Sequence, residues 1–133
     1  MLSPPAGAAA EDTSKANENS LVLLVVYGSK KILFTGDINS SVERELIKKY
    51  GSLIDSDVLK IAHHGSKNSS SEEFLRAVSP EYAVISVGAF NQFGHPAQET
   101  LDRISAQRAA VIRTDVSGGV ILSSDGSKIW KNK

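Results

Sequence analysis

The sequence contains no cysteine, which excludes disulfide bonds and thiolate metal ligands. Its 15 basic and 15 acidic residues cancel, so the chain lacks the basic excess that is typical of strong nonspecific DNA binding. Apolar runs are short, and residues 21–27 fall far below the ~18 residues that a membrane-spanning helix needs. The N-terminus also lacks the basic start and apolar centre of a secretion signal. A hydrophobic content of 41% is nevertheless sufficient for one modest globular core.

Large apolar side chains are scarce in residues 1–19, which instead contain Pro4, Pro5, Gly7 and a run of alanines. This composition predicts a flexible linker or terminus. From residue 20 onward the apolar pattern becomes regular, and we expect residues 20–133 to form a single folded domain.

Two strands open that domain. Residues 21–27 (LVLLVVY) form a continuous aliphatic run, which is typical of a strand that is covered on both faces. A Gly-Ser turn separates this run from a second strand at residues 32–34. The two strands are therefore expected to form a hairpin.

Helices and further strands alternate in the remainder of the chain. We expect helices at residues 40–51, 69–78 and 95–108, with Ser40–Glu43 and Ser70–Glu73 as capping boxes and Pro96 at the first position of the third helix. Strands are expected at residues 57–62, 82–88, 110–113, 118–123 and 127–130. This alternation predicts an α/β fold, in which about three helices pack on a mixed sheet.

Acidic and imidazole side chains follow three of the expected strands. Asp37 comes after the second strand, His63 and His64 after the third, and His95 after the fourth. In such sheets ligands collect beyond the carboxyl ends of the strands, and right-handed crossovers place successive parallel strands side by side. We therefore expect Asp37 to meet an imidazole of the His63–His64 pair. Carboxylate and imidazole together suit Zn²⁺ or Mn²⁺.

Each of these residues also has a purely structural explanation. Asp37 could cap the helix that follows it, His63 or His64 could be hydrogen-bonded in a turn, and His95 could cap a helix or stack on a neighbour. The sequence has 3 histidines and no His-x-His-x-Asp-His cluster. A two-metal centre commonly uses about five to seven protein ligands. These residues alone are therefore not expected to form a complete binuclear hydrolase site.

Three segments, taken in order, resemble the metallo-β-lactamase-fold domain of ComEC-type competence proteins. They are residues 17–38 with the motif TGD, residues 57–96 with HHGS and GHP, and residues 111–122. Proteins of this type are membrane channels for DNA uptake in natural transformation. The resemblance covers residues 17–129 and implies the C-terminal half of an αββα sandwich.

The resemblance also implies roles for individual residues. Asp37 matches the family's metal-bridging aspartate and His63 its late metal-ligand histidine, although His64 could hold that position instead. The histidine of the pair that is not a ligand would face the substrate and donate a proton to a leaving oxygen, so that His64 and His95 are the expected catalytic residues. Expected contacts to a substrate phosphate come from Gly65, Ser66 and Asn91, with Arg113 and Thr114 as weaker candidates.

Cofactor, partners and location follow from the same resemblance. The full domain would use a divalent metal, Zn²⁺ or Mn²⁺, to hydrolyse phosphodiester bonds of single-stranded DNA. Its other half, with the His-x-His-x-Asp-His motif, and a membrane channel would belong to the same polypeptide. We expect a soluble domain of a bacterial cell-membrane protein that is inactive in isolation. One apolar face of its sheet would lack its usual cover.

Two other functions remain open at this point. The chain could be a non-catalytic DNA-positioning or interaction module with a degenerate metal site. A local basic patch would then come from Lys60, Lys67, Arg76 and Arg113. Alternatively, it could belong to a phosphoesterase of the same fold that acts on another substrate, such as choline phosphate or RNA, because related folds act on many substrates.

Overall fold

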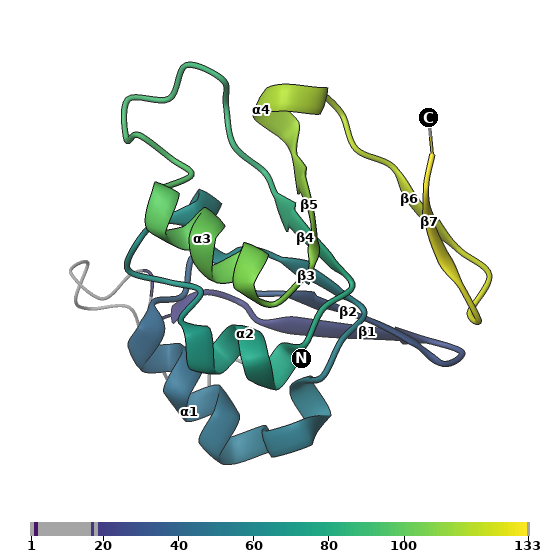
Figure 1. Ribbon diagram of the computed structural model, residues 1–133. Helices are drawn as coiled ribbons and strands as arrows, with labels where there is room; N and C mark the ends of the chain where they lie inside the picture. Colours follow the sequence, from purple (N-terminus) through teal and green to yellow (C-terminus); the bar gives the residue numbers. More distant parts are fainter. Residues whose placement is uncertain (1, 3–16, 18, 133) are drawn as a thin grey trace.

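The computed structural model describes residues 2, 17 and 19–132 (Figure 1). The flexible segment expected at residues 1–19 therefore lies largely outside the described residues. Leu2 is described and well anchored. Its N–H donates to the carbonyl of Val22 at 2.7 Å, and its own carbonyl accepts from the hydroxyl of Tyr50 at 2.8 Å.

A five-stranded mixed sheet forms the centre of the molecule, as the alternation of elements predicted. Its spatial order follows the chain, β1-β2-β3-β4-β5. The first pair is an antiparallel hairpin, and β2, β3, β4 and β5 are parallel to one another. The strands are β1 (Leu23–Tyr27), β2 (Lys30–Phe34), β3 (Val58–Lys60), β4 (Tyr82–Ile85) and β5 (Ala110–Arg113). A separate hairpin consists of β6 (Leu122–Ser124) and β7 (Ile129–Lys131).

Three helices cover one face of the sheet, and Figure 1 shows them on the side opposite the β6–β7 hairpin. They are α1 (Ser40–Tyr50), α2 (Glu72–Val78) and α3 (Gln98–Ala106). Their buried side chains, such as Leu46, Phe74 and Ile104, join Leu33 and Leu59 of the sheet in one apolar core. A further single turn, α4 (Thr114–Ser117), follows β5 and was not predicted.

Helix α1 begins at residue 40 as predicted, whereas α2 and α3 begin three residues after the predicted residues 69 and 95, and the predicted caps and first helical position are wrong by one or two residues. Asn39, not Ser40, caps α1, because its side-chain oxygen accepts from the N–H groups of the first turn. Ser71, not Ser70, caps α2 in the same way. Pro96 precedes α3 by two residues instead of opening it. Consecutive Ser and Asn residues offer several equivalent caps, so the sequence pattern alone could not select among them.

Glu43 does not take part in the predicted capping box and instead has another structural role. Its carboxylate is fully buried and accepts hydrogen bonds from the N–H groups of Ser70 (2.5 Å) and Ser71 (2.9 Å). A buried carboxylate is costly unless such donors satisfy it. Glu43 therefore fixes the start of α2 against α1, and it also fixes the path of the chain between β3 and α2.

Strand β1 is the edge of the sheet, and the prediction that both of its faces are covered was wrong. Val26 and Tyr27 are exposed by 60% and 59%. The helices cover one face only, and β1 has a neighbouring strand on one side only. Most of the aliphatic side chains of β1 therefore stay exposed in the part of the chain that the structure describes.

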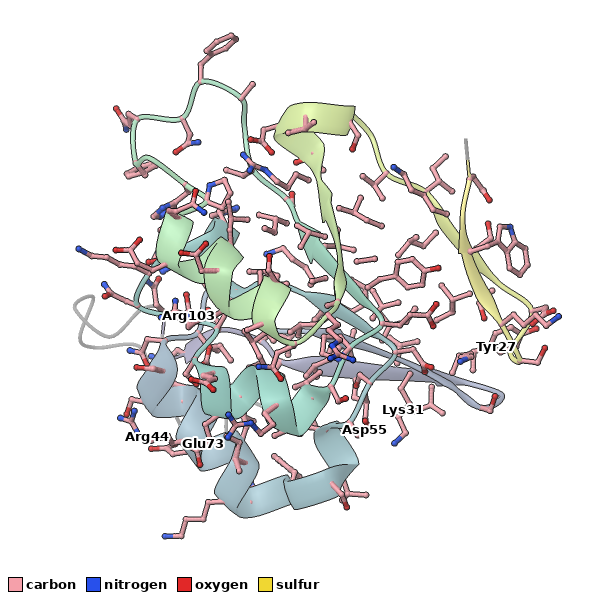
Figure 2. The ribbon with its side chains drawn as sticks, viewed as in Figure 1. Tyr27, Lys31, Arg44, Asp55, Glu73 and Arg103 are labelled. Atoms are coloured by element: carbon pink, nitrogen blue, oxygen red, sulfur yellow. The ribbon has the colours of Figure 1, made fainter. Side chains whose placement is uncertain are left out.

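The uncovered face of the sheet forms an apolar groove of about 240 Å³. It is lined by Ile32, Phe34, Val58, Lys60, Val84, Val120 and Leu122. The β6–β7 hairpin approaches this side and touches the β1–β2 turn, where the N–H and hydroxyl of Ser29 both donate to the carbonyl of Gly126. Figure 2 labels Tyr27 beside this junction. The sequence had led us to expect such an exposed apolar sheet face.

Replacing Glu43 with Gln should lower the free energy of unfolding by about 1–3 kcal/mol, because the amide buries N–H donors where two backbone donors already point. Urea unfolding measures this change. Glu45→Gln on the exposed side of the same helix is the matched control, and it should stay within about 0.5 kcal/mol of the original chain. Equal losses in the two variants would contradict the assignment.

Candidate functional site

The candidate site begins where β2 and β3 end side by side. Phe34 lies opposite Lys60 in the parallel register at the end of each strand, and three residues further along the chain come Asp37 and His63 respectively. The N–H of His63 donates to the carbonyl of Gly36 at 3.1 Å, and the hydroxyl of Thr35 donates to the carbonyl of Lys60 at 2.7 Å. These bonds hold the TGD and HHGS segments together beyond the edge of the sheet.

Asp37 and His64 converge. The Nε2 atom of His64 lies 3.8 Å from Oδ1 of Asp37, and its Nδ1 lies 2.7 Å from the carbonyl oxygen of Ser86. A carbonyl oxygen can only accept, so Nδ1 carries the hydrogen and, in the neutral ring, the Nε2 lone pair faces Asp37. Metal-binding histidines are usually oriented by a carbonyl in this way. The expectation that Asp37 meets an imidazole of the pair is confirmed.

His63 lies edge-on to its neighbour His64. Both histidines have positive φ angles, 48° and 53°, which non-glycine residues adopt only at a cost of roughly 1–3 kcal/mol. Their ring centroids are 6.5 Å apart at an interplanar angle of 72°. His63 lines a polar depression of about 400 Å³ next to the N-terminus of α1. The other lining residues are Asn17, Asn39, Ser40, Ser41 and Asn68.

His95 closes the other side of the site. Its ring centroid lies 5.8 Å from that of His63, and Phe93 stacks on it at 6.0 Å with an interplanar angle of 27°. Burial lowers the pKa of His95, and the neighbouring charges of His63 and His64 lower it further. Within the described part of the chain, its buried Nδ1 atom has no hydrogen-bond partner.

Gly65 and Ser66 lie beneath the histidines, and both are buried. Gly65 has a φ of +86°, and a β-carbon there would lie 2.6 Å from Cβ of Pro96. Its carbonyl accepts from the N–H of Ala97 at 2.9 Å, and the carbonyl of Ser66 accepts from the Thr100 hydroxyl at 3.0 Å. The two residues that we expected to contact substrate thus join the HHGS turn to the GHP segment.

Asn91, another expected substrate contact, uses its side chain within its own loop. The amide nitrogen donates to the carbonyls of Gly88 (3.0 Å) and His95 (2.6 Å), and the amide oxygen accepts from the N–H groups of Phe93 (3.2 Å) and His95 (2.9 Å). The four bonds close the loop around the amide group.

The weaker phosphate candidates are also engaged locally. The guanidinium of Arg113 pairs with Asp115 at 2.6 Å. The hydroxyl of Thr114 accepts from the N–H of Val87 at 2.8 Å and lies 2.9 Å from the Val87 carbonyl. The Thr114 contacts fasten the start of α4 to the chain that follows β4, and the Arg113–Asp115 pair is local to the same turn.

Arg103 is a supporting residue that sequence reasoning missed. It extends from α3, and its Nη2 atom donates to the carbonyls of Lys67 (3.1 Å) and Ser69 (3.0 Å) just after the HHGS turn (Figure 2). An arginine on an amphipathic helix is normally solvated, so no pattern in the sequence distinguished this one.

The donor set fits a divalent metal in part. Two ligands of one zinc ion, each about 2.1 Å from it, lie at most roughly 4.2 Å apart. The separation of 3.8 Å between Asp37 and His64 is within that limit. Among residues 2, 17 and 19–132, however, no group of three or more His, Asp or Glu side chains is close enough to hold an ion. These residues can therefore supply two ligands of a shared metal.

Comparison with known proteins identifies the family. The model of the metallo-beta-lactamase superfamily matches residues 11–89, which is more than half of the chain. The chain belongs to the metallo-β-lactamase superfamily. The matched segment includes Asp37, His63 and His64, so the residues of the candidate site lie within the part of the chain that the superfamily model matches.

Curated relatives also support the resemblance to competence proteins. The chain is 46% identical over 104 residues to "Competence protein ComA" of Neisseria gonorrhoeae, covering 78% of this chain and 15% of the relative. It is 38% identical over 120 residues to "ComE operon protein 3" of Bacillus subtilis, covering 90% and 15%. It is 38% identical over 108 residues to "Recombination protein 2" of Haemophilus influenzae, covering 81% and 13%.

The chain thus spans about 15% of the length of these relatives. None of its described helices is both long and apolar enough to cross a membrane. Its membership of the superfamily and its likeness to competence proteins are shown. The activity of the longer relatives as whole proteins can be assigned to this chain only as a proposal.

Gly65→Ala should lower the free energy of unfolding by about 1–3 kcal/mol, because the new β-carbon collides with Pro96 and the residue must keep a left-handed φ. Gly88→Ala is the control, since no atom lies within 4 Å of a β-carbon there. Thermal or urea unfolding measures both variants. A Gly65→Ala variant as stable as Gly88→Ala would show that the HHGS turn is not pressed against Pro96.

His95 should titrate with a pKa below the ordinary value of 6.5, because burial and the adjacent histidines disfavour its charged form. The unfolded chain then binds a proton that the folded chain excludes. The contribution of His95 to stability is fully present above about pH 6.5 and is lost as the pH falls below that value. NMR titration of the ring protons gives the pKa directly. In His95→Gln the loss of stability over this interval should be smaller, and an unchanged loss would contradict the assignment.

Proposed function

We propose that the chain forms part of the active site of a metal-dependent phosphodiesterase domain that acts on single-stranded DNA during DNA uptake. The observation that carries this proposal is the convergence of Asp37 with an Nε2 atom of His64 that Ser86 orients for metal binding. Similarity to proteins named for competence and recombination supports the DNA substrate.

The geometry favours His64 as the metal ligand together with Asp37, in place of His63. His64 has the nitrogen that faces the carboxylate, whereas His63 faces the polar depression beside α1. A bound Zn²⁺ or Mn²⁺ would supply a water of lowered pKa and would stabilise negative charge on the phosphate. His63, in its protonated form, would donate a ring proton to the leaving oxygen.

His95 and the buried turn have supporting parts in this proposal. The lowered pKa of His95 favours its neutral imidazole, which could accept or donate a hydrogen bond beside the phosphate without adding charge. Gly65 and Ser66 hold the histidines in place, and Asn91 shapes the neighbouring loop. These residues would affect substrate binding through the position of the groups that they support.

Hydrolysis needs more ligands than the described residues provide. A catalytic zinc commonly has about three protein ligands, and Asp37 with His64 accounts for two. We therefore expect this chain by itself to bind metal weakly and to hydrolyse no phosphodiester. Cleavage is expected in a longer protein that adds the remaining ligands, in the membrane context that the competence relatives indicate.

The non-catalytic alternative depends on a basic patch, and the contacts weaken it. Arg113 is paired with Asp115, and Arg76 with Glu72. The ammonium group of Lys60 donates to a backbone carbonyl at 2.8 Å in the apolar groove. Of the four basic residues considered, Lys67 alone is an exposed side chain without a described acidic neighbour.

Titration with Zn²⁺, followed by calorimetry and by NMR of the backbone amides, tests the metal ligands. Asp37→Asn and His64→Ala should each weaken binding about tenfold or more, and His63→Ala should change it less than about threefold. Asp55→Asn, at the exposed carboxylate labelled in Figure 2, is the control. Loss of binding in His63→Ala but not in His64→Ala would exchange the two roles. No binding at millimolar Zn²⁺ would refute the site.

A further inference from the structure

Two aromatic side chains project from the loop that joins β4 to α3. We call residues 88–95 the aromatic loop. Phe90 is completely exposed and Phe93 is 71% exposed, although burial of a phenyl ring is normally favourable. Exposed apolar surface that gathers in one region of a protein is a feature of interaction sites.

The aromatic loop is held in a defined conformation. The four hydrogen bonds of Asn91 join its two ends, and the hydroxyl of Thr114 accepts from the N–H of Val87 just before it. One face of Phe93 stacks on His95 with an interplanar angle of 27°. The loop thus displays Phe93 as an oriented ring, with little conformational freedom left to lose when a ligand binds.

The loop also encloses a shallow pocket of about 180 Å³. Its lining is almost entirely apolar, and it is made by His64, Val87, Gly88, Asn91, Phe93 and His95. His64 borders this pocket and also lies 3.8 Å from Asp37. A ligand in the pocket is therefore a direct neighbour of the candidate metal ligands.

We propose that the aromatic loop is a stacking platform for the bases of single-stranded DNA, with Phe93 stacking the base in the pocket and Phe90 the next one. The substrate class rests on the proposed function. A base in the pocket would place its phosphodiester beside Asp37 and His64. In a duplex the bases are already stacked on each other, so the platform selects single strands.

The chemistry of the loop fits this ligand better than it fits a protein or lipid partner. Every base has a π-face, and stacking on an aromatic ring tolerates any sequence. The segment 86–97 contains no acidic residue that would repel a phosphate backbone. Inserting Phe90 and Phe93 into a lipid surface would bring the adjacent Asp37 carboxylate toward an apolar phase.

NMR titration of the ¹⁵N-labelled chain in EDTA tests the platform without metal or hydrolysis. The probes are an oligothymidylate of roughly twelve nucleotides, an abasic strand of the same length and a duplex. We expect the oligothymidylate to bind more tightly than the other two. Phe93→Ala should weaken its binding about tenfold and leave the abasic strand unaffected, and Phe90→Ala should have a smaller effect in the same direction.

Matched variants separate stacking from general hydrophobic contact. Phe93→Trp should keep the affinity for oligothymidylate, and Phe93→Leu should lose it, because leucine is apolar but has no ring. Leu53→Ala removes another exposed apolar side chain and should change nothing. The proposal is overturned if leucine substitutes fully for Phe93, if the abasic strand loses affinity equally, or if no strand binds.

Two further results would reassign the loop or separate the two proposals. If Phe90→Ala and Phe93→Ala abolish binding to phosphatidylglycerol vesicles and leave oligothymidylate binding intact, the loop contacts lipid and the proposal is wrong. If the chain shows base-dependent binding but binds no Zn²⁺, the proposed metal site is refuted and the stacking platform is supported. Zinc binding without base-dependent binding would do the reverse.

Discussion

The parallel pairing of β2 with β3 is the constraint on which the site depends. It places the chain after each strand in contact, and the bond from the His63 N–H to the Gly36 carbonyl extends the pairing beyond the sheet. This pairing brings Asp37 and the two histidines together, although α1, a short 3-10 turn and β3 separate them in sequence. A one-residue change of register would turn alternate side chains to the other face and separate the carboxylate from the imidazole.

The HHGS turn is strained, and its surroundings compensate for that strain. Two consecutive non-glycine residues with left-handed φ cost roughly 1–3 kcal/mol each, and such a turn persists only where many contacts determine it. Arg103 binds two carbonyls just after the turn, and Glu43 binds two N–H groups further along, at the start of α2. These two charged side chains come from different helices, so the helical layer holds the imidazoles in place.

Much of the fold could be predicted from the sequence, since it depends on periodic burial. The hairpin, the helix–strand alternation and the mixed sheet follow from apolar spacing. The meeting of Asp37 with a histidine follows from strand ends alone. Details that depend on three-dimensional contacts could not be predicted. Which histidine meets Asp37 depends on the Ser86 carbonyl, which lies just beyond the end of β4, and the burial of Glu43 depends on the N-terminus of α2.

The burial of β1 was misjudged for a different physical reason. An aliphatic run reports how much apolar surface a segment has available, but it does not report what covers that surface. Val25, Phe34 and Val84 have the composition of an interior, and they lie at the surface of the described residues or line its groove. The sequence therefore indicated that these side chains tend to be buried, but it did not indicate what would pack against them.

Lys60 connects the uncovered face to the candidate site. It lines the apolar groove, where burial lowers its pKa, while the negative charge of Asp37 opposes that shift. A second layer packed over the groove would remove more water from the ammonium group and lower its pKa further. The Asp37 carboxylate would then matter more to Lys60, at the same time as a cation at Asp37 would repel it. If the proposed metal site is filled, a cation at Asp37 and a layer over the groove would both act on the same ammonium group, so the two events would be coupled electrostatically through Lys60.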